Sequence, residues 1–275
     1  MGPIRHISSL SVSFMIISTI LSVVIPIAAI IFMAVKKKLN WKATLFGALF
    51  FLVFVIVLEN IMHNIVLGAD ATKSVVYQNL PLYVIYGGFA AGIFEETARL
   101  LCFRFILKVN SENTIYTGIS YGLGHGGIEA MFIGGLASIG NLVTSVMFNR
   151  GLFDKLTDSL NGQQLEAFNK SINDLINAPS YMFLITGVER VTSLALQIAL
   201  SLLVFKAVSD KKWKFLAYAV LIHAGIDMIA ILFQRKVITN IFLLEGVILL
   251  LTAAVVYAAF RINRAKPLEG EILNE

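Results

Sequence analysis

The sequence predicts an all-α, multi-pass transmembrane helix bundle, and three observations support this fold class. Hydrophobic residues make up 57% of the 275 residues and charged residues only 14%, whereas soluble domains carry about 25% charged residues. The mean hydropathy is +0.81. Several apolar runs reach about 20 residues, the length that a helix needs to cross a bilayer. We therefore expect one transmembrane domain over residues 1–275, located in the cell membrane.

Seven apolar segments are long enough to be membrane-spanning helices. They lie near residues 8–35, 43–67, 81–105, 113–134, 180–207, 213–234 and 238–261. The segment 135–149 is apolar but short for a full span. It is expected either to continue the fourth helix beyond Gly134 and Gly135 or to form a re-entrant segment. Residues 151–179 are more polar, and the spacing of their apolar residues predicts one or two amphipathic helices outside the membrane.

Basic residues in the loops predict the orientation of the chain. Loops 36–42 and 206–214 contain four Lys residues each, and cytoplasmic loops are enriched in Lys and Arg. The C-terminal end is also basic, with Arg261, Arg264 and Lys266. This pattern places the N-terminus outside, the C-terminus in the cytoplasm and the amphipathic loop 151–179 outside. Because the basic residues lie in short loops, we expect contacts with membrane lipid and none with nucleic acid.

Charged and histidine side chains inside the spans indicate a functional site, because such residues are costly in a bilayer and usually face the bundle interior. The third to sixth spans contain Glu95, Glu96 and Arg99, then His125 and Glu129, then Glu189 and Arg190, then His223 and Asp227. Glu59, His63 and Glu245 lie in the second and seventh spans, where structural or interfacial roles are expected. At about 1.5 Å of rise per residue, Glu95, His125 and His223 lie about 14–17 Å from the cytoplasmic ends of their helices. These three side chains are therefore expected to meet at one level.

The spacing within each span adds to this expectation. Arg99 follows Glu95 by four residues, and Glu129 follows His125 and Asp227 follows His223 at the same interval, so each pair shares one helix face. A carboxylate next to an imidazole can fix its tautomer and raise its basicity. Arg99 can neutralise one glutamate and leave the other as a general base.

Structural interpretations of the same residues stay open at this point. Arg99 and a glutamate could be only a buried ion pair, and Glu189 with Arg190 could either support the site or clamp helices together. The glycines at 122, 124, 126 and 127 could let a substrate backbone approach His125. They could equally permit close packing between helices.

The motifs "EETAR", "GHGGIE" and "HAGID" resemble those of the YhfC-type membrane peptidase family. More distantly, they are similar to the Abi/CPBP intramembrane proteases, the group that contains the type II CAAX prenyl endopeptidase. The resemblance implies that Glu95 or Glu96 activates water with support from Arg99, while His125 and His223 polarise the scissile carbonyl or hold a metal. Two residues, rather than the three of the wider group, separate Arg99 from the glutamate pair, and Asp227 stands in place of an Asn.

A carboxylate at position 227 favours metal ligation, because histidine plus carboxylate is a familiar zinc set. His125, His223 and Asp227 are therefore candidate ligands of a zinc ion, and a metal-free mechanism is the alternative. Glu129, Glu189 and Arg190 are candidate supporting residues.

The function that these residues predict is an intramembrane endopeptidase acting on a membrane-associated peptide or protein. A water-filled cavity is expected beside the site, opening towards the cytoplasm. The main alternative is a proton-coupled transporter that uses the buried His and acidic cluster. A non-catalytic membrane scaffold with a degenerate site is a third interpretation.

Overall fold

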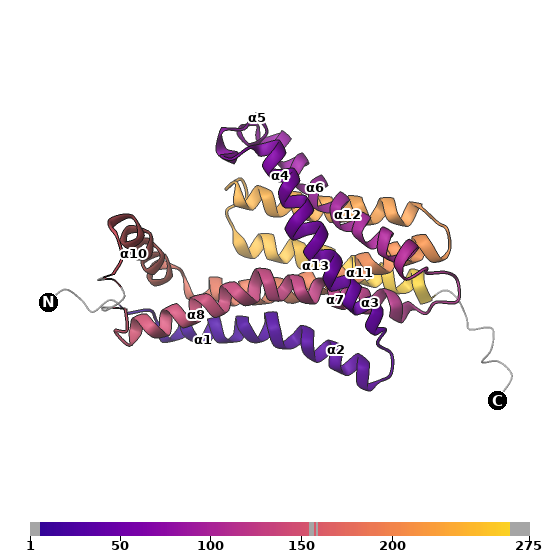
Figure 1. Cartoon of the computed structure of the whole chain (residues 1–275), viewed down its shortest axis with the longest axis horizontal. Coiled ribbons are helices and arrows are strands. Elements are labelled where there is room, and N and C mark those ends of the chain that lie inside the picture. The colour runs from indigo at the N-terminus through magenta and orange to yellow at the C-terminus, as the bar shows by residue number, and fades with distance from the viewer. Residues whose placement is uncertain (1–5, 154–156, 158, 265–275) are drawn as a thin grey trace. The chain divides into compact units, whose positions relative to one another are not determined.

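The computed structural model describes residues 6–153, 157 and 159–264, and all regular structure in these residues is helical (Figure 1). The α-helices are α1 (Ser9–Thr19), α2 (Ile25–Val35), α3 (Trp41–Phe51), α4 (Asn60–Leu67), α5 (Val75–Gln78), α6 (Leu80–Leu101), α7 (Ile115–Glu129), α8 (Leu136–Asn149), α10 (Gly162–Asn177), α11 (Ser180–Ser209), α12 (Lys214–Gln234) and α13 (Ile241–Arg264). Short π-helical segments continue several of them, at Ile20–Val24, Leu52–Glu59, Cys102–Ile106 and Ala130–Gly135. Lys266, part of the predicted basic C-terminal end, lies outside the described residues.

Six described helical stretches are long and apolar enough to cross a membrane. They are Ser9–Val35, Trp41–Leu67, Ile115–Asn149, Ser180–Ser209, Lys214–Gln234 and Ile241–Asn263. Helix α6 corresponds to the predicted third span and has 22 residues, but Glu95, Glu96 and Arg99 make it more polar than these six. The all-α, multi-pass membrane bundle is therefore confirmed, while its orientation in the bilayer stays a prediction.

The apolar segment 135–149 continues the fourth predicted span. Residues Ile115–Asn149 form a single helix of 35 residues, about 52 Å long at 1.5 Å per residue. Glycines weaken helices mainly where water competes for the backbone, and an apolar environment removes that competition. Gly134 and Gly135 therefore stay helical, within the π-helical segment. The continuous helix is the correct alternative, and the expected re-entrant segment is wrong.

The described residues divide into two compact units. The first unit contains the chain up to Ala28 together with Glu129–Val191, and the second contains Ala29–Ile128 together with the chain from Thr192 onward. Within the first unit, α1 packs against α8. The hydroxyl oxygens of Ser18 and Ser138 are 2.8 Å apart at this contact.

Helix α10 accounts for most of the predicted amphipathic segment. Asn161 and Gln164 form a capping box at its N-terminus, which satisfies backbone N–H groups that would otherwise lack partners. Ile172 and Leu175 are its buried residues, so one apolar stripe faces the rest of the first unit and the remaining surface is polar. That α10 lies outside the membrane remains a prediction.

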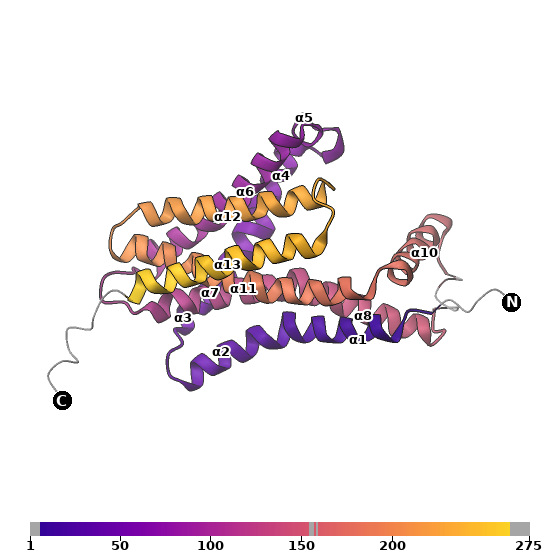
Figure 2. The same ribbon diagram turned by 180° about the vertical axis from the view of Figure 1, so that it is seen from behind.

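In the second unit, α6 and α12 lie side by side over much of their length (Figure 2). Glycines allow this approach: a Cβ atom at Gly88 would lie 2.5 Å from the Ala224 carbonyl oxygen, and one at Gly92 would lie 2.9 Å from the Val220 carbonyl oxygen. The packing of α6 on α12 fixes the two helices that carry the glutamate pair and His223. Small residues permit such backbone contacts in membrane helices.

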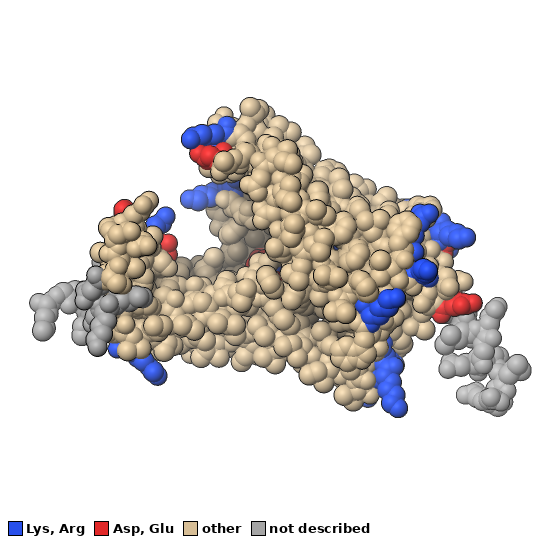
Figure 3. All heavy atoms as spheres, in the orientation of Figure 1, with Lys and Arg blue, Asp and Glu red and all other residues tan. Residues whose placement is uncertain are grey.

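The apolar core of the second unit is built mainly by α11 against α7 and the end of the third predicted span. Leu200 and Leu202 on α11 are fully buried, as are Tyr121 on α7 and Phe103. On the face drawn in Figure 3, Lys and Arg side chains lie in a few small groups, and most of the remaining described surface is uncharged. This distribution is typical of helices that cross a bilayer.

Candidate active site

Helix α6 places the glutamate pair and Arg99 in the interior of the second unit. Glu96 and Arg99 are fully buried, and Glu95 is 6% exposed. One turn of helix separates Arg99 from both carboxylates, so its guanidinium contacts both. Nη1 donates to Glu96 Oε1 at 2.5 Å, and Nη2 donates to Glu95 Oε2 at 3.3 Å. The two carboxylates are thus held side by side by one cation.

Helix α11 contributes two polar residues that sequence reasoning missed, Gln197 and Ser201. The Gln197 amide oxygen accepts a hydrogen bond from Arg99 Nη2, and its Nε2 donates to Glu95 Oε2 at 3.1 Å. Ser201 Oγ accepts from Arg99 Nε at 3.2 Å. Their spacing of four residues in an apolar helix, on one face, is the signal that could have identified them. Arg99 is therefore held between α6 and α11.

His125 reaches Glu95 from helix α7. Its Nε2 lies 2.8 Å from Glu95 Oε2, and the residue is fully buried. The ring packs edge-on against Phe51, with centroids 5.2 Å apart, and stacks on Tyr121 at 6.0 Å. Aromatic contacts on two sides fix the imidazole plane. His125 is thus oriented towards Glu95 by its surroundings.

The glycines around His125 serve helix packing. A Cβ atom at Gly122 would lie 2.6 Å from Ile198 Cα, and one at Gly124 would overlap the Thr44 carbonyl oxygen. At Gly126 the nearest atom would be Gln197 Cβ, at 2.8 Å. Helices α3 and α11 fill the space that a substrate backbone was expected to use. For these three glycines the packing interpretation is correct and substrate approach is wrong.

His223 on α12 completes the cluster. Its Nδ1 lies 2.8 Å from Glu96 Oε1, and its Nε2 faces Glu95 Oε1 at 3.8 Å and Asp227 Oδ2 at 3.6 Å. The imidazole therefore lies among three carboxylates. Glu95 in turn lies between His125 and His223, which come from different helices. The expected meeting of these three side chains at one level is what the structure shows.

The three predicted supporting residues belong to the first unit. Arg190 Nη1 lies 3.6 Å from Glu129 Oε1, and Nη2 donates to Glu189 Oε1. Glu129 and Arg190 are buried, so the contact joins α11 to the end of α7 inside that unit. This geometry matches a structural clamp, and a supporting role in catalysis stays a prediction.

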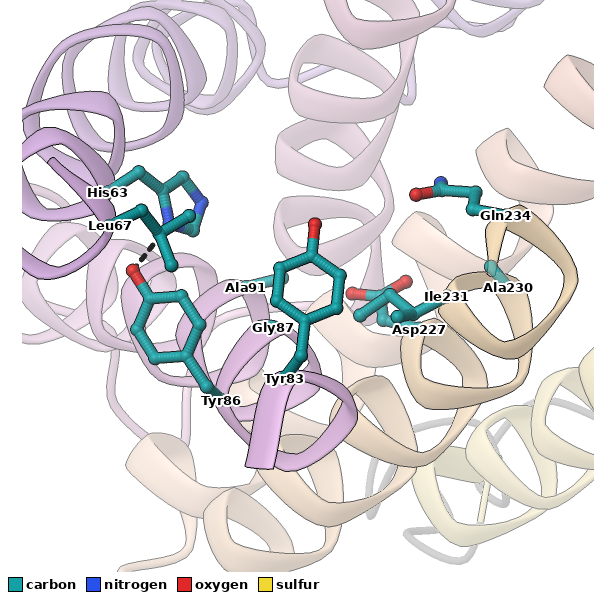
Figure 4. Close-up of a pocket in the computed structure, with 10 residues that line it drawn as sticks. All are labelled: His63, Leu67, Tyr83, Tyr86, Gly87, Ala91, Asp227, Ala230, Ile231 and Gln234. Atoms are coloured by element: carbon teal, nitrogen blue, oxygen red, sulfur yellow. Dashed lines mark hydrogen bonds between the residues drawn. The ribbon is translucent and has the colours of Figure 1, made fainter. Parts of the chain in front are cut away.

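A cavity of about 340 Å³ adjoins Asp227 (Figure 4). Its walls come from α4 (His63, Leu67), the N-terminal half of α6 (Tyr83, Tyr86) and the C-terminal half of α12 (Gln234). These are the helix ends that the charge pattern places outside. Under that predicted orientation the cavity lies on the outer side of the site, so its expected opening towards the cytoplasm stays a prediction together with the orientation itself.

The charges and donor atoms of the cluster fit a divalent metal ion. Three carboxylates, those of the buried Glu95 and Glu96 and the partly exposed Asp227, face one guanidinium. Such an excess of negative charge is costly inside a helix bundle without a cation or protons. Glu96 Oε2 is buried and has no hydrogen-bond partner among the described residues. Imidazole nitrogens and carboxylate oxygens are ligands that zinc prefers.

The distances between the candidate ligand atoms also fit a bound divalent metal ion. Two ligands bound at about 2.0–2.2 Å to one tetrahedral zinc are about 3.3–3.6 Å apart. His223 Nε2 lies 3.6 Å from Asp227 and 3.8 Å from Glu95, a spacing longer than a hydrogen bond and close to that value. Glu95 and His125 also offer ligand atoms within 4.8 Å of each other. The residues present therefore fit a metal, without identifying it.

Comparison with known proteins gives two matches. The sequence model of the family described as "YhfC intramembrane metalloprotease" matches residues 21–248. The chain is also 36% identical over 258 residues to a Bacillus subtilis (strain 168) protein described as "Uncharacterized membrane protein YhfC", covering 94% of this chain and 98% of that protein. No solved structure matches this chain. The motif positions around Glu95, His125 and His223 all fall inside the matched region. The chain therefore belongs to the YhfC intramembrane metalloprotease family.

Proposed function

We propose that this protein is an intramembrane endopeptidase that hydrolyses a peptide bond of a membrane-associated substrate with a water molecule activated by Glu95. The observation that carries the proposal is the position of Glu95, whose carboxylate lies between the Nε2 atoms of His125 and His223 at 2.8 and 3.8 Å. Peptide hydrolysis needs a base for water, a stabiliser for the oxyanion and an acid for the leaving amine. A carboxylate between two imidazoles supplies these groups.

Glu95, rather than Glu96, is the base in this proposal. Glu95 faces both imidazoles and has slight exposure, whereas Glu96 is fully buried between Arg99 and His223 Nδ1. A carboxylate on Nδ1 fixes the histidine tautomer and leaves Nε2 directed at the reaction space. Glu96 and Arg99 are therefore positioning residues. Gln197 holds the Glu95 carboxylate in place through its amide N–H.

The proposed metal would be held by residues of the same cluster, with His125, His223 and Asp227 as candidate ligands and Glu95 beside them. When bound, such an ion supplies Lewis-acid activation of water and of the carbonyl group. The chain itself contributes the base at Glu95 and the exclusion of bulk water. In the metal-free alternative, protonated imidazoles of His125 and His223 would donate to the developing oxyanion or hand a proton to the leaving amine, because a nitrogen that binds a metal has no proton to donate.

Cleavage of a model transmembrane peptide in proteoliposomes tests the proposal. The wild-type protein is expected to cut the peptide, and Glu95→Gln is expected to lower kcat by about 10²–10⁴-fold, the usual contribution of a general base. An Ile93→Leu variant on the same helix is the matched control, because Ile93 is exposed on the helix surface. Full activity with Glu95 and Glu96 both changed to Gln would contradict the proposal. Proton-driven solute uptake without cleavage would favour a transporter.

A further inference from the structure

The cavity beside Asp227 has a wall chemistry that the proposed reaction does not explain. Tyr83 and Tyr86 project into it from α6, and His63 and Gln234 face it from α4 and α12 (Figure 4). The Tyr86 hydroxyl lies 2.7 Å from His63 Nδ1 and donates to Met62 Sδ. His63 in turn lies 3.3 Å from Glu59. These contacts hold the Tyr86 ring in one orientation, so the wall is preformed.

The cavity follows the same helix faces as the candidate active site. Ala91 lines it and precedes Glu95 by four residues on α6, while Asp227 lines it and follows His223 by four residues on α12. Residues four apart share a helix face. The cavity therefore begins one helical turn beyond the reactive level, with Asp227 belonging to both.

The size and polarity of the walls define what fits. A volume of about 340 Å³ is at the lower end of ligand pockets, which measure about 300–1,000 Å³. Aromatic and aliphatic side chains form most of the lining, including Tyr83, Tyr86 and Ile231. None of the ten lining residues is a Lys or Arg, and Asp227 is the acidic one among them. Arg235 lies outside the lining, with its guanidinium 5.2 Å from the Tyr83 ring centroid. Asp227 disfavours an acidic group in the cavity, and a large uncharged group would be accommodated.

We infer that this cavity is the specificity pocket of the proposed peptidase, and that it binds one large uncharged side chain of the peptide substrate within two residues of the scissile bond. The inference rests on the proposed function. One helical turn corresponds to about 5.4 Å along α6, and an extended peptide advances about 3.3 Å per residue. A substrate whose scissile carbonyl lies at Glu95 thus places the side chain of a residue one or two positions away in the cavity.

A cleavage panel tests the pocket. Model transmembrane peptides that differ at single positions are incubated with the wild-type protein, and the cut sites are mapped by mass spectrometry. Cuts are expected within two residues of Leu, Met, Phe or Trp, about 10- to 200-fold faster than next to Ala, the range for pocket-based discrimination. Peptides with Glu at that position are expected to be cut as slowly as those with Ala. Equal cleavage rates next to large side chains and next to Ala would overturn the inference.

Two cavity-filling variants sharpen this experiment. Ala91→Phe and Ala230→Leu fill the cavity from opposite helices, and both residues line it. Each is expected to shift the preference from large side chains to Ala, measured as a fall of about 10-fold or more in the ratio of kcat/KM for Phe peptides to kcat/KM for Ala peptides. Ile93→Phe is the control, because Ile93 is 51% exposed and is not a lining residue. An unchanged preference in both filled variants would overturn the pocket.

A binding measurement separates failure of the pocket from failure of the proposed function. A peptide carrying benzoyl-phenylalanine is photo-crosslinked to the Glu95→Gln variant, and the attachment site is mapped. Crosslinks to α6 or α12 residues that line the cavity are expected, and adding Ala91→Phe is expected to remove them while Ile93→Phe retains them. Crosslinks without any wild-type cleavage would support the pocket and contradict the peptidase. Wild-type cleavage together with crosslinks only to residues outside the cavity would support the peptidase and contradict the pocket.

Discussion

Nδ1 of His223 lies 2.8 Å from Oε1 of Glu96, a carboxylate that Arg99 also contacts. The Nδ1 contact selects the tautomer of the ring. We therefore propose that Glu96 acts on the reaction space through the imidazole, and that the two adjacent glutamates of α6 carry different tasks.

The two glutamates are expected to respond differently to amidation. Glu96→Gln keeps an oxygen that can accept from His223 or Arg99, so kcat is expected to fall by about 10- to 100-fold, as for the loss of an outer-shell partner. KM is expected to stay near the wild-type value, since Glu96 is fully buried. Steady-state kinetics on a model peptide measure both. A loss equal to that of Glu95→Gln would contradict this division of tasks between the two glutamates.

Metal content is expected to depend on the two histidines. Purified wild-type protein should contain about one equivalent of zinc or another divalent metal, and chelation should abolish cleavage, with recovery on adding the metal back. His125→Ala and His223→Ala should each lose the bound metal, measured by elemental mass spectrometry. His63→Ala is the matched control, because His63 lines the neighbouring cavity. Stoichiometric metal in both site variants would eliminate the metal-dependent mechanism.

Arg99 is expected to be essential for folding stability. It is fully buried between Glu95, Glu96 and Gln197, and removing one partner of a buried ion pair costs about 3–5 kcal/mol. Arg99→Gln should therefore unfold at a markedly lower temperature in detergent. Arg99→Lys should recover only part of the loss, since an ammonium cannot reproduce the fork of the guanidinium. Lys73→Gln, an exposed ion-pair residue, should unfold like wild type.

Gly124→Ala is expected to separate α7 from α3. The new methyl group would overlap the Thr44 carbonyl oxygen, and overpacking of this kind costs about 1–3 kcal/mol. Because His125 is the next residue, activity should fall together with stability. Gly246→Ala on α13 meets nothing within 4 Å and should be neutral or slightly stabilising. Equal thermal unfolding of the two variants would show that α7 does not need this contact.

The predicted orientation can be checked by labelling introduced cysteines with a membrane-impermeant maleimide. The chain has one cysteine, Cys102, which is buried, so a Cys102→Ala background is suitable. Lys73→Cys should label in intact cells and Lys212→Cys only after permeabilisation, since both lysine side chains are exposed. The opposite pattern would invert the topology that the loop charges predict.

Much of the fold was predictable because membrane spans depend on apolar length, which can be counted along the chain. The rise of about 1.5 Å per helical residue also allowed the depth of each side chain to be estimated, and this estimate predicted that Glu95, His125 and His223 lie at the same level. It could not identify Gln197 as their partner, because depth says nothing about the rotation of α11. The direction in which the cavity opens could not be predicted for a similar reason: depth from one membrane face does not show which face the open space reaches.

The glycines of α7 were the most ambiguous feature of the sequence. A glycine beside a histidine is compatible both with a substrate backbone that approaches the histidine and with a neighbouring helix that packs there. The sequence does not distinguish the two, whereas the structure places Thr44 and Ile198 against these glycines. The resemblance to the wider Abi/CPBP group remains a prediction, as do the roles of the individual site residues.

The backbone contact at Gly88 and Gly92 is expected to limit the relative movement of α6 and α12. If α12 slid along α6 by a fraction of a turn, its side chains would collide with the α6 backbone at these two glycines. We therefore expect the two helices to move together as one rigid pair. Changes in bilayer thickness, which tilt or shift individual helices, must then be absorbed by other helices. The distance between the α6 glutamates and His223 on α12 is therefore expected to change little when the lipid composition of the membrane changes.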